Sequence, residues 1–189
     1  MAKAAVLASG NGSNFQKLAE ALRNTPHQIS LLICDRKNAG CFTRAENLGI
    51  PSLYVPYYNR EARKAEKEIL SALTDCGAQI IFLAGFMKIL SPAIIDSFKG
   101  DIINIHPALL PRHPGAHGIE DSFNSPDAEL GITIHKVDYG MDTGPILKQA
   151  SFARQEGLTI EEAEEKIHKL EHEHYPLLAL ELLDLLDKQ

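Results

Sequence analysis

Short apolar runs rich in β-branched residues alternate along this chain with longer amphipathic segments, and this alternation limits the folds open to it. Such runs, bounded by turn signals, are typical of strands buried on both faces, and the segments between them have helical periodicity. The pattern favours an α/β fold with a doubly wound, mostly parallel, Rossmann-like sheet. The predicted strands are residues 4–8, 29–34, 53–55, 80–84, 102–105, 130–137 and 146–152, and the predicted helices are 15–23, 41–48, 60–74, 91–98, 117–123 and 159–186.

The ends of the predicted helices carry start and stop signals. Thr159 is a suitable N-cap for the last helix, because the glutamates that follow it stand near the positive end of the helix dipole. Gly49 is a suitable C-cap, and Pro92 stands where a first helical turn tolerates proline. Pro176 is expected to kink the last helix or to split it in two. The leucine-rich half after Pro176 packs on the sheet or on a second copy of the chain, which leaves a homodimer open.

A glycine-rich turn, SGNGSN at residues 9–14, connects the first strand to the first helix. Ser13 followed by Gln16 fits a capping box, which predicts Ser13 as the N-cap. Free backbone N–H groups and the helix dipole make such a helix start a site for an anion, and phosphate is the expected one. A dinucleotide fingerprint would need a glycine where Phe15 stands, which weighs against a nicotinamide or flavin site. A tight turn without a ligand is the alternative.

The segment 101–115, DIINIHPALLPRHPG, carries the candidate chemistry. Pro107 ends the strand, because proline cannot donate to a ladder. Asn104 and His106 stand two residues apart at the end of that strand, so their side chains share one face. The carboxyl edge of a parallel sheet is where α/β proteins bind ligands. A hydrogen-bonded corner without chemistry is the alternative.

A second segment, VDYGMDTGP at 137–145, is a glycine-rich turn with two carboxylates. Asp138 or Asp142 would lie beside His106 if the two loops converge. A carboxylate there would raise the pKa of the imidazole and orient its ring. Asn, His and Asp together can stabilise an oxyanion and move a proton. His135, inside the preceding strand, is interpreted as a packed polar residue.

Composition weighs against several classes of protein. The chain has 189 residues, of which 44% are hydrophobic and 23% charged, as expected for one soluble globular domain. Its net charge of −6 argues against a nucleic-acid partner. No apolar run is long enough to span a membrane. Three cysteines without CxxC spacing indicate free thiols in a reducing cytoplasm, so we expect a cytoplasmic protein with small-molecule partners.

Three further features have two interpretations each. The apolar run at 85–90 is typical of core, but it could also form the wall of a pocket for a flat heteroaromatic ligand. Asp35 stands where a dinucleotide fold places a ribose-binding acid, but the incomplete glycine pattern favours a solvated loop charge. His168 and His172 are four residues apart on one helix face and could chelate zinc. No acidic triad or CxxC motif supports this, so we expect no metal.

Four motifs stand along the chain: SGNGSNF at 9–15, LAGFMKILSP at 83–92, NIHPALLP at 104–111 and DTGP at 142–145. In this order they resemble the folate-dependent formyltransferases. The block Asn-x-His-Pro-x-Leu-Leu-Pro is specific for that wider family. The glycine loop and the chain length make the chain similar to the branch that acts on glycinamide ribonucleotide. The resemblance covers nearly the whole chain and implies the Rossmann-like formyltransferase fold.

The resemblance implies a role for each motif. It implies catalysis by Asn104, His106 and Asp142. It implies that the substrate phosphate is bound by Gly12, Ser13, Asn14, His168 and Glu171, with His168 at a place where the family typically has glutamine. It implies folate binding by Arg60, Met87, Lys88, Ile89, Leu90, Asn104, Asp138, Tyr139, Gly140, Met141 and Asp142. It also implies one formyltransferase domain over 1–189, with a mononucleotide-binding-like half at 1–100 and a catalytic and folate-loop half at 101–189.

The implied reaction transfers the formyl group of 10-formyltetrahydrofolate to the amine of glycinamide ribonucleotide in purine biosynthesis. The products are formylglycinamide ribonucleotide and tetrahydrofolate. Asn104 and a protonated His106 would donate hydrogen bonds to the tetrahedral oxyanion, and Asp142 would order a water that relays protons. The folate is a co-substrate, and no metal is needed.

Three other functions share parts of this pattern. Methionyl-tRNA formyltransferase would carry an additional C-terminal RNA-binding domain. A formyltetrahydrofolate hydrolase usually carries an N-terminal regulatory domain, and it would use water in place of the amine. A non-catalytic nucleotide-binding module would need the glycine loop but not Asn104, His106 and Asp142.

Overall fold

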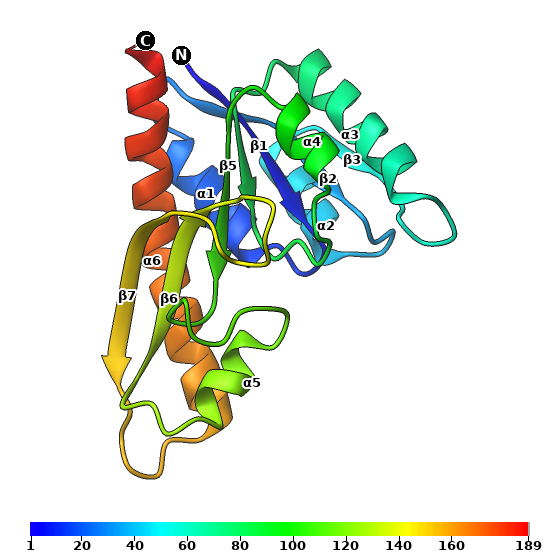
Figure 1. Ribbon diagram of the computed structural model, residues 1–189. Coiled ribbons are helices and arrows are strands. Elements are labelled where there is room, and N and C mark those ends of the chain that lie inside the picture. The colour runs from blue at the N-terminus through cyan, green and yellow to red at the C-terminus, as the bar shows by residue number, and fades with distance from the viewer. Residues whose placement is uncertain (189) are drawn as a thin grey trace.

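A seven-stranded sheet with helices on both faces forms the framework of the protein, whose computed structural model describes residues 1–188 (Figure 1). The strand order is β3-β2-β1-β4-β5-β6-β7; β6 runs antiparallel to both of its neighbours, β5 and β7, and the pairs among β1 to β5 are parallel. The prediction of a doubly wound, mostly parallel α/β sheet is confirmed. The strands are β1 (Lys3–Ala8), β2 (Gln28–Cys34), β3 (Ser52–Tyr54), β4 (Ile80–Leu83), β5 (Asp101–His106), β6 (Glu129–Lys136) and β7 (Ile146–Ala153). The helices are α1 (Ser13–Leu22), α2 (Gly40–Leu48), α3 (Ala62–Cys76), α4 (Pro92–Ser97), α5 (Gly118–Phe123) and α6 (Ile160–Asp187).

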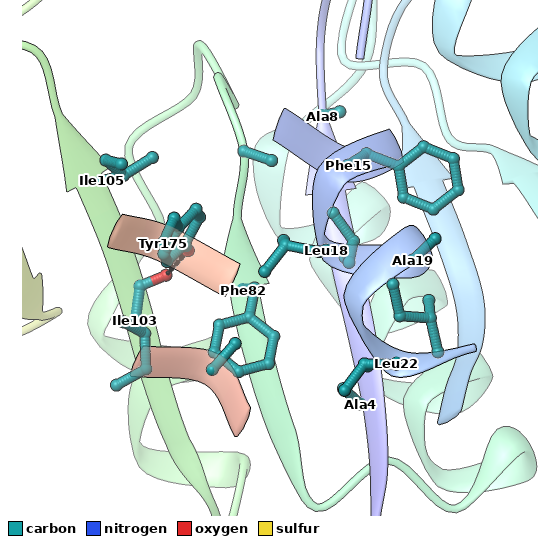
Figure 2. Close-up of a cluster of buried hydrophobic side chains, with 14 of the residues drawn as sticks. Ala4, Ala8, Phe15, Leu18, Ala19, Leu22, Phe82, Ile103, Ile105 and Tyr175 are labelled. Atoms are coloured by element: carbon teal, nitrogen blue, oxygen red, sulfur yellow. Dashed lines mark hydrogen bonds between the residues drawn. The ribbon is translucent and has the colours of Figure 1, made fainter. Parts of the chain in front are cut away.

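Different helices cover the two faces of the sheet, because its central strands present apolar side chains on both sides. Helices α1, α2 and α6 pack over one face, where Phe82 and Ile103 belong to the buried cluster (Figure 2). Helices α3 and α4 pack over the other face, where Leu7 and Ile81 are fully buried. The two cores fix the sheet, so its carboxyl edge is a firm support for loops.

Helix α6 is continuous from Ile160 to Asp187, so the predicted split at Pro176 is wrong. Pro176 is buried, and the packing of this helix face offsets the hydrogen bond that proline cannot donate. The neighbouring Tyr175 fastens the helix to the sheet. Its hydroxyl lies 3.0 Å from the carbonyl oxygens of Leu83 and Ile103, and its ring meets Phe82 edge-on at 5.7 Å between centroids.

Two predicted caps are confirmed, and a third is wrong. Thr159 forms a capping box with Glu162, and Gly49 ends α2 in the left-handed region at φ 67°. Ser13 is not the N-cap of α1: Gly12 takes that place at φ 78°, without any side-chain cap. Gln16 does not reach back, because its side chain bonds Glu20 and Arg44. The start of this helix therefore depends on a backbone conformation that suits glycine.

Four smaller observations concern the start of α3, the cysteines, membrane spans and the last residue. Helix α3 begins at Ala62, so Arg60 lies in the preceding loop and not in the predicted helix. Cys34, Cys41 and Cys76 are free thiols, as predicted. Within residues 1–188, no helix combines the length and the apolar content needed to cross a membrane. The end of the predicted domain, residue 189, lies outside the described residues.

Candidate active site

Three side chains meet at the carboxyl edge of β5, as the sequence predicts. Asn104 and His106 project from the end of this strand, and Asp142 comes from the loop between β6 and β7. Asp142 Oδ1 lies 3.4 Å from Asn104 Nδ2, and Asp142 Oδ2 lies 3.5 Å from His106 Nδ1. Asp142 adopts a positive φ of 55°, which turns its side chain toward the strand end. The predicted convergence of the two loops is therefore correct, with Asp142 as the carboxylate.

The ring of His106 is almost fully buried, and its two nitrogens have different surroundings. Nε2 lies 2.7 Å from the carbonyl oxygen of His113. A carbonyl only accepts, so Nε2 carries a hydrogen and donates it. In a neutral ring Nδ1 is then the unprotonated nitrogen, and it faces Asp142. His106 is thus arranged to accept a proton at Nδ1 beside a carboxylate that would stabilise the resulting cation.

The net pKa of His106 lies below its usual range, although Asp142 acts to raise it as predicted. Burial is the largest influence and favours the neutral ring. Asp142 and the hydrogen bond to His113 act in the opposite direction but do not outweigh burial. Without ligands His106 is therefore a neutral base at neutral pH, and not the protonated donor that the resemblance implied.

Asp142 lies among groups that favour its ionised form. Its burial acts to raise the pKa of the carboxyl group, but the nearby His135, the Gly115 N–H and the nearby His106 act to lower it, and the net pKa is below the usual range. The Gly115 N–H donates to Oδ2 at 2.7 Å. Asp142 therefore stays ionised, with a fixed orientation toward His106.

His135 belongs to the site, although the sequence interpretation placed it among packed polar residues. It stands opposite Asn104 in the antiparallel pairing of β5 and β6. Its Nδ1 donates to the Lys136 carbonyl at 2.8 Å, so in the neutral ring Nε2 accepts from Asn104 Nδ2 at 3.2 Å. His135 therefore orients the amide of Asn104. The available signal was its place near the end of a strand directly before the loop that carries Asp142.

The predicted phosphate residues also come together, from the two ends of the chain. Gly12, Ser13 and Asn14 form the start of α1, where the first N–H groups have no partner inside the helix. From α6, the buried carboxylate of Glu171 accepts hydrogen bonds from Asn14 Nδ2 at 3.0 Å and His168 Nδ1 at 2.9 Å. The hydrogen bond to Glu171 raises the pKa of His168. The result is an imidazole with a raised pKa beside a helix N-terminus, an arrangement that suits an anion.

The loop after β4 provides one side of the predicted folate pocket. Met87 and Ile89 are exposed, whereas Leu90 is buried in the core under α3 and α4. The Met87 N–H donates to Ser9 Oγ at 2.8 Å, which ties this loop to the glycine-rich turn. Exposed apolar side chains on a fixed backbone suit contact with a flat ring.

Lys88 in this loop corrects the interpretation of Asp35. Its ammonium lies 3.7 Å from Asp35 Oδ2, and the side chain of Asp35 is only 3% exposed. Asp35 is therefore a buried partner of Lys88 and not a solvated charge. The sequence could not show this, because Lys88 is distant along the chain and approaches only through the strand order β2-β1-β4.

The loop 138–142 follows β6 and contacts α4 through Tyr139. Asp138 accepts from the Gly140 N–H at 3.0 Å and from Thr143 Oγ1 at 2.7 Å, which gives the loop a compact turn. Tyr139 and Met141 are exposed, and the Tyr139 hydroxyl donates to Asp96. Arg60 is separate from this group, because its guanidinium pairs with Glu68 at 3.0 Å.

A metal centre and a groove elsewhere on the molecule are two other candidates for parts of a site. In the part of the chain that the structure describes, no group of His, Cys, Asp or Glu side chains is arranged to hold a metal ion. A groove of about 470 Å³ lies at the opposite edge of the sheet, and residues such as Leu73, Phe98 and Leu186 line it. None of the site residues takes part in that groove.

Known proteins share both the sequence and this geometry. Residues 2–179 match the family described as formyl transferase. The phosphoribosylglycinamide formyltransferase of Bacillus subtilis is 41% identical over 188 residues, which cover 98% of this chain and 96% of that protein. The trifunctional purine biosynthetic protein adenosine-3 of Drosophila pseudoobscura pseudoobscura is 37% identical over 92% of this chain, which spans only 13% of that protein. The crystal structure of glycinamide ribonucleotide transformylase 1 from Geobacillus kaustophilus superposes with a TM-score of 0.92 at 39% identity, covering 97% of this chain and 99% of that one.

Proposed function

This chain belongs to the formyl transferase family, and from that membership we propose how its residues transfer a formyl group from 10-formyltetrahydrofolate to the amine of glycinamide ribonucleotide. The products are formylglycinamide ribonucleotide and tetrahydrofolate, and the reaction serves purine biosynthesis. The observation that carries the proposal is the meeting of Asn104, His106 and Asp142 within 3.5 Å at the carboxyl edge of β5.

Asn104 and His106 stabilise the tetrahedral intermediate. The amine nitrogen attacks the formyl carbon, and the carbonyl oxygen becomes an oxyanion. Both N–H groups of Asn104 are occupied in the ligand-free enzyme, by His135 at 3.2 Å and by Asp142 at 3.4 Å. The longer bond is the weaker one, so the N–H directed at Asp142 turns to the oxyanion. The protonated ring of His106 supplies the second donor, after it has received a proton.

Proton transfer follows from the state of His106. Its neutral Nδ1 accepts a proton from the attacking amine, directly or through a water held by Asp142. Asp142, kept ionised, stabilises the imidazolium that forms. The carbon–N10 bond then breaks, the oxyanion returns to a carbonyl, and the proton passes to N10 of the folate. In this order of steps His106 starts neutral and becomes protonated during the reaction, whereas the resemblance implied a ring that is protonated from the start.

The phosphate of the ribonucleotide binds at the start of α1. The free N–H groups of Ser13 and Asn14 donate to it, and Gly12 gives the turn its left-handed backbone. Glu171 is a carboxylate and would repel a phosphate, so its role is indirect. It holds the amide of Asn14 and raises the pKa of His168, which favours the protonated ring that would add positive charge beside the phosphate.

The folate lies between the loop after β4 and the loop 138–142. Met87 and Ile89 form one wall, which the buried Leu90 supports from the core, and Tyr139, Gly140 and Met141 form the other, with Asp138 and Asp142 at the pterin. Lys88 and Arg60, which pair with Asp35 and Glu68 in the structure, would exchange these partners for the anionic tail of the folate. We extend the proposal to one formyltransferase domain over 1–189 in a cytoplasmic enzyme. Its partners are small-molecule substrates, and it binds no nucleic acid, no membrane and no metal. Its helix α6 could support a homodimer.

An absorbance assay of tetrahydrofolate release tests the proposal. The protein is mixed with 10-formyltetrahydrofolate, with and without glycinamide ribonucleotide. Release that requires the ribonucleotide supports the transferase. Release without the ribonucleotide would make the protein a formyltetrahydrofolate hydrolase. If folded protein releases no tetrahydrofolate, the non-catalytic nucleotide-binding module is the remaining function. A higher melting temperature in the presence of the ribonucleotide alone would then identify it.

A further inference from the structure

We propose that His113 and Asp127 position His106 for catalysis, by holding the His113 carbonyl that receives the His106 Nε2 hydrogen. The inference rests on the function proposed above and deepens it. Both residues lie outside the four motifs of the family resemblance. They do not touch the reacting atoms, so they are positioning residues.

The His113 carbonyl decides which nitrogen of His106 is available for chemistry. Its oxygen lies 2.7 Å from Nε2 and keeps a hydrogen there. Nδ1 is consequently the nitrogen without a hydrogen in the neutral ring, and it is also the one that faces Asp142 at 3.5 Å. If the carbonyl turned away, the hydrogen could move to Nδ1, where Asp142 would accept it. His106 would then no longer be able to take a proton at the reacting side.

The loop that carries this carbonyl has few attachments. It is fixed at one end, where the Leu110 N–H donates to Thr133 Oγ1 at 2.9 Å, and at the other, where the Gly115 N–H donates to Asp142. Between these points, the side-chain ties recorded within residues 1–188 both go to Asp127. Arg112 Nη1 lies 2.7 Å from Asp127 Oδ1, and His113 Nε2 lies 2.7 Å from Asp127 Oδ2.

The backbone of His113 is in a less common conformation, which such a tie helps to hold. Its φ is 55°, in the left-handed region that non-glycine residues adopt uncommonly, although Asn, Asp and His do so more often than the rest. Relaxation to the ordinary region would rotate the peptide that follows and move the carbonyl away from His106. The side chains of His113 and Asp127 are only 18% and 16% exposed, so their hydrogen bond is better shielded from solvent than a surface contact. Asp127 stands just before β6, which gives it a rigid support.

The other charged groups around His106 are accounted for. Three charged or titratable groups influence the pKa of His106: Asp142 from the β6–β7 loop, His135 from β6 and Glu171 from α6. On the remaining side, Gly118 of α5 packs on the ring, and a Cβ there would lie 3.0 Å from Nε2. None of these groups replaces the hydrogen bond that the His113 carbonyl accepts.

Three variants test the inference. His113→Asn removes the ring but suits the left-handed backbone, because asparagine tolerates that region. Asp127→Ala removes the acceptor. Arg112→Gln is the matched control, since it removes the other partner of Asp127 and leaves His113 in place. In ligand-free enzyme, ¹⁵N NMR of the imidazole nitrogens reports which nitrogen of His106 carries the hydrogen.

We expect wild type and Arg112→Gln to keep the hydrogen on Nε2. We expect His113→Asn and Asp127→Ala to show a mixture of tautomers and a lower midpoint of His106 protonation. Their kcat should fall about tenfold, and the KM for glycinamide ribonucleotide should stay within about twofold, because orientation and not binding is lost. The double variant should be no worse than the single ones, because the two residues act as a unit.

An unchanged tautomer and kcat in folded His113→Asn would overturn the inference, and so would an effect of Arg112→Gln as large as that of Asp127→Ala. If Asp127→Ala does not fold, His113→Asn, which removes the His113 ring from the same contact, is compared with Arg112→Gln instead. The NMR measurement needs no substrate. If wild type fails to transfer a formyl group, the proposed function is wrong, while the tautomer still decides whether His113 and Asp127 position His106.

Discussion

The substitution Asp142→Asn removes the charge that stabilises His106 when it becomes protonated. The two groups are 3.5 Å apart. At an effective dielectric constant near 20, opposite unit charges at this distance attract by about 5 kcal/mol. Contact with solvent and with other donors reduces the usable part to roughly half, about 2.5–3 kcal/mol. Since 1.36 kcal/mol corresponds to a tenfold change in rate, kcat should fall by about a hundredfold.

The assay is steady-state release of tetrahydrofolate at saturating co-substrate, followed by absorbance. We expect the KM for glycinamide ribonucleotide to stay near normal, because the phosphate binds at the start of α1. Asp101→Asn is a matched control, since Asp101 opens the same strand β5, and its exposed carboxylate pairs with Lys136. Near-normal turnover in Asp142→Asn, or an equal loss in Asp101→Asn, would refute the reasoning.

Three further predictions concern the same site. In an NMR titration of the ligand-free enzyme, His106 should titrate below pH 6.5 in wild type and lower still in Asp142→Asn, because burial lowers its pKa and Asp142 opposes that effect; a midpoint above 7 would contradict this. The pKa of His168 is raised by its pair with Glu171, so this pair adds to the free energy of unfolding when His168 is protonated. The contribution should be complete below pH 6.5, and it should be lost as pH rises through the folded-state pKa. Urea unfolding of His168→Gln at several pH values checks this, with an expected difference of about 0.2–1 kcal/mol because the ring is partly exposed. Gly12→Ala places a Cβ 2.6 Å from Cys41 Cβ at φ 78°, and it should raise the KM for the ribonucleotide at least about tenfold and lower the Tm, whereas Gly10→Ala, whose Cβ meets nothing within 4 Å, should change neither.

Local sequence determined much of the fold, because its signals were short in range. β-branched runs gave the strands and their order along the chain, and Thr159 and Gly49 marked helix ends by capping chemistry that needs only neighbouring residues. Asn104 and His106 could be placed on one face from the two-residue period of a strand. Ser13 is not the predicted cap, because the contacts of Gln16 outweigh the local preference, and of the two outcomes predicted at Pro176 only the split is excluded.

The arrangement of charges could not be read from the sequence in the same way. The partnership of Asp35 with Lys88 and of His135 with Asn104 depends on which strands are neighbours in the sheet. The pKa of His106 depends on two opposing influences: burial lowers it, and the charge of Asp142 raises it. A sequence shows that both are present, but only the packed structure shows that burial is the larger.

The two ends of the described chain meet far from the chemistry. The amino group of Met1 pairs with Asp187, and the nearby His27 contacts Asp184 at 2.9 Å, so the start of β1 and the end of α6 lie together (Figure 1). Both are at the amino edge of the parallel strands, whereas substrates are handled at the carboxyl edge. A linker attached at either terminus would therefore lead away from the catalytic loops and would cost only an exposed ion pair. This unit is consequently modular: it can be fused into a larger polypeptide without being reshaped, and the trifunctional insect protein contains its relative as a small part of a much longer chain.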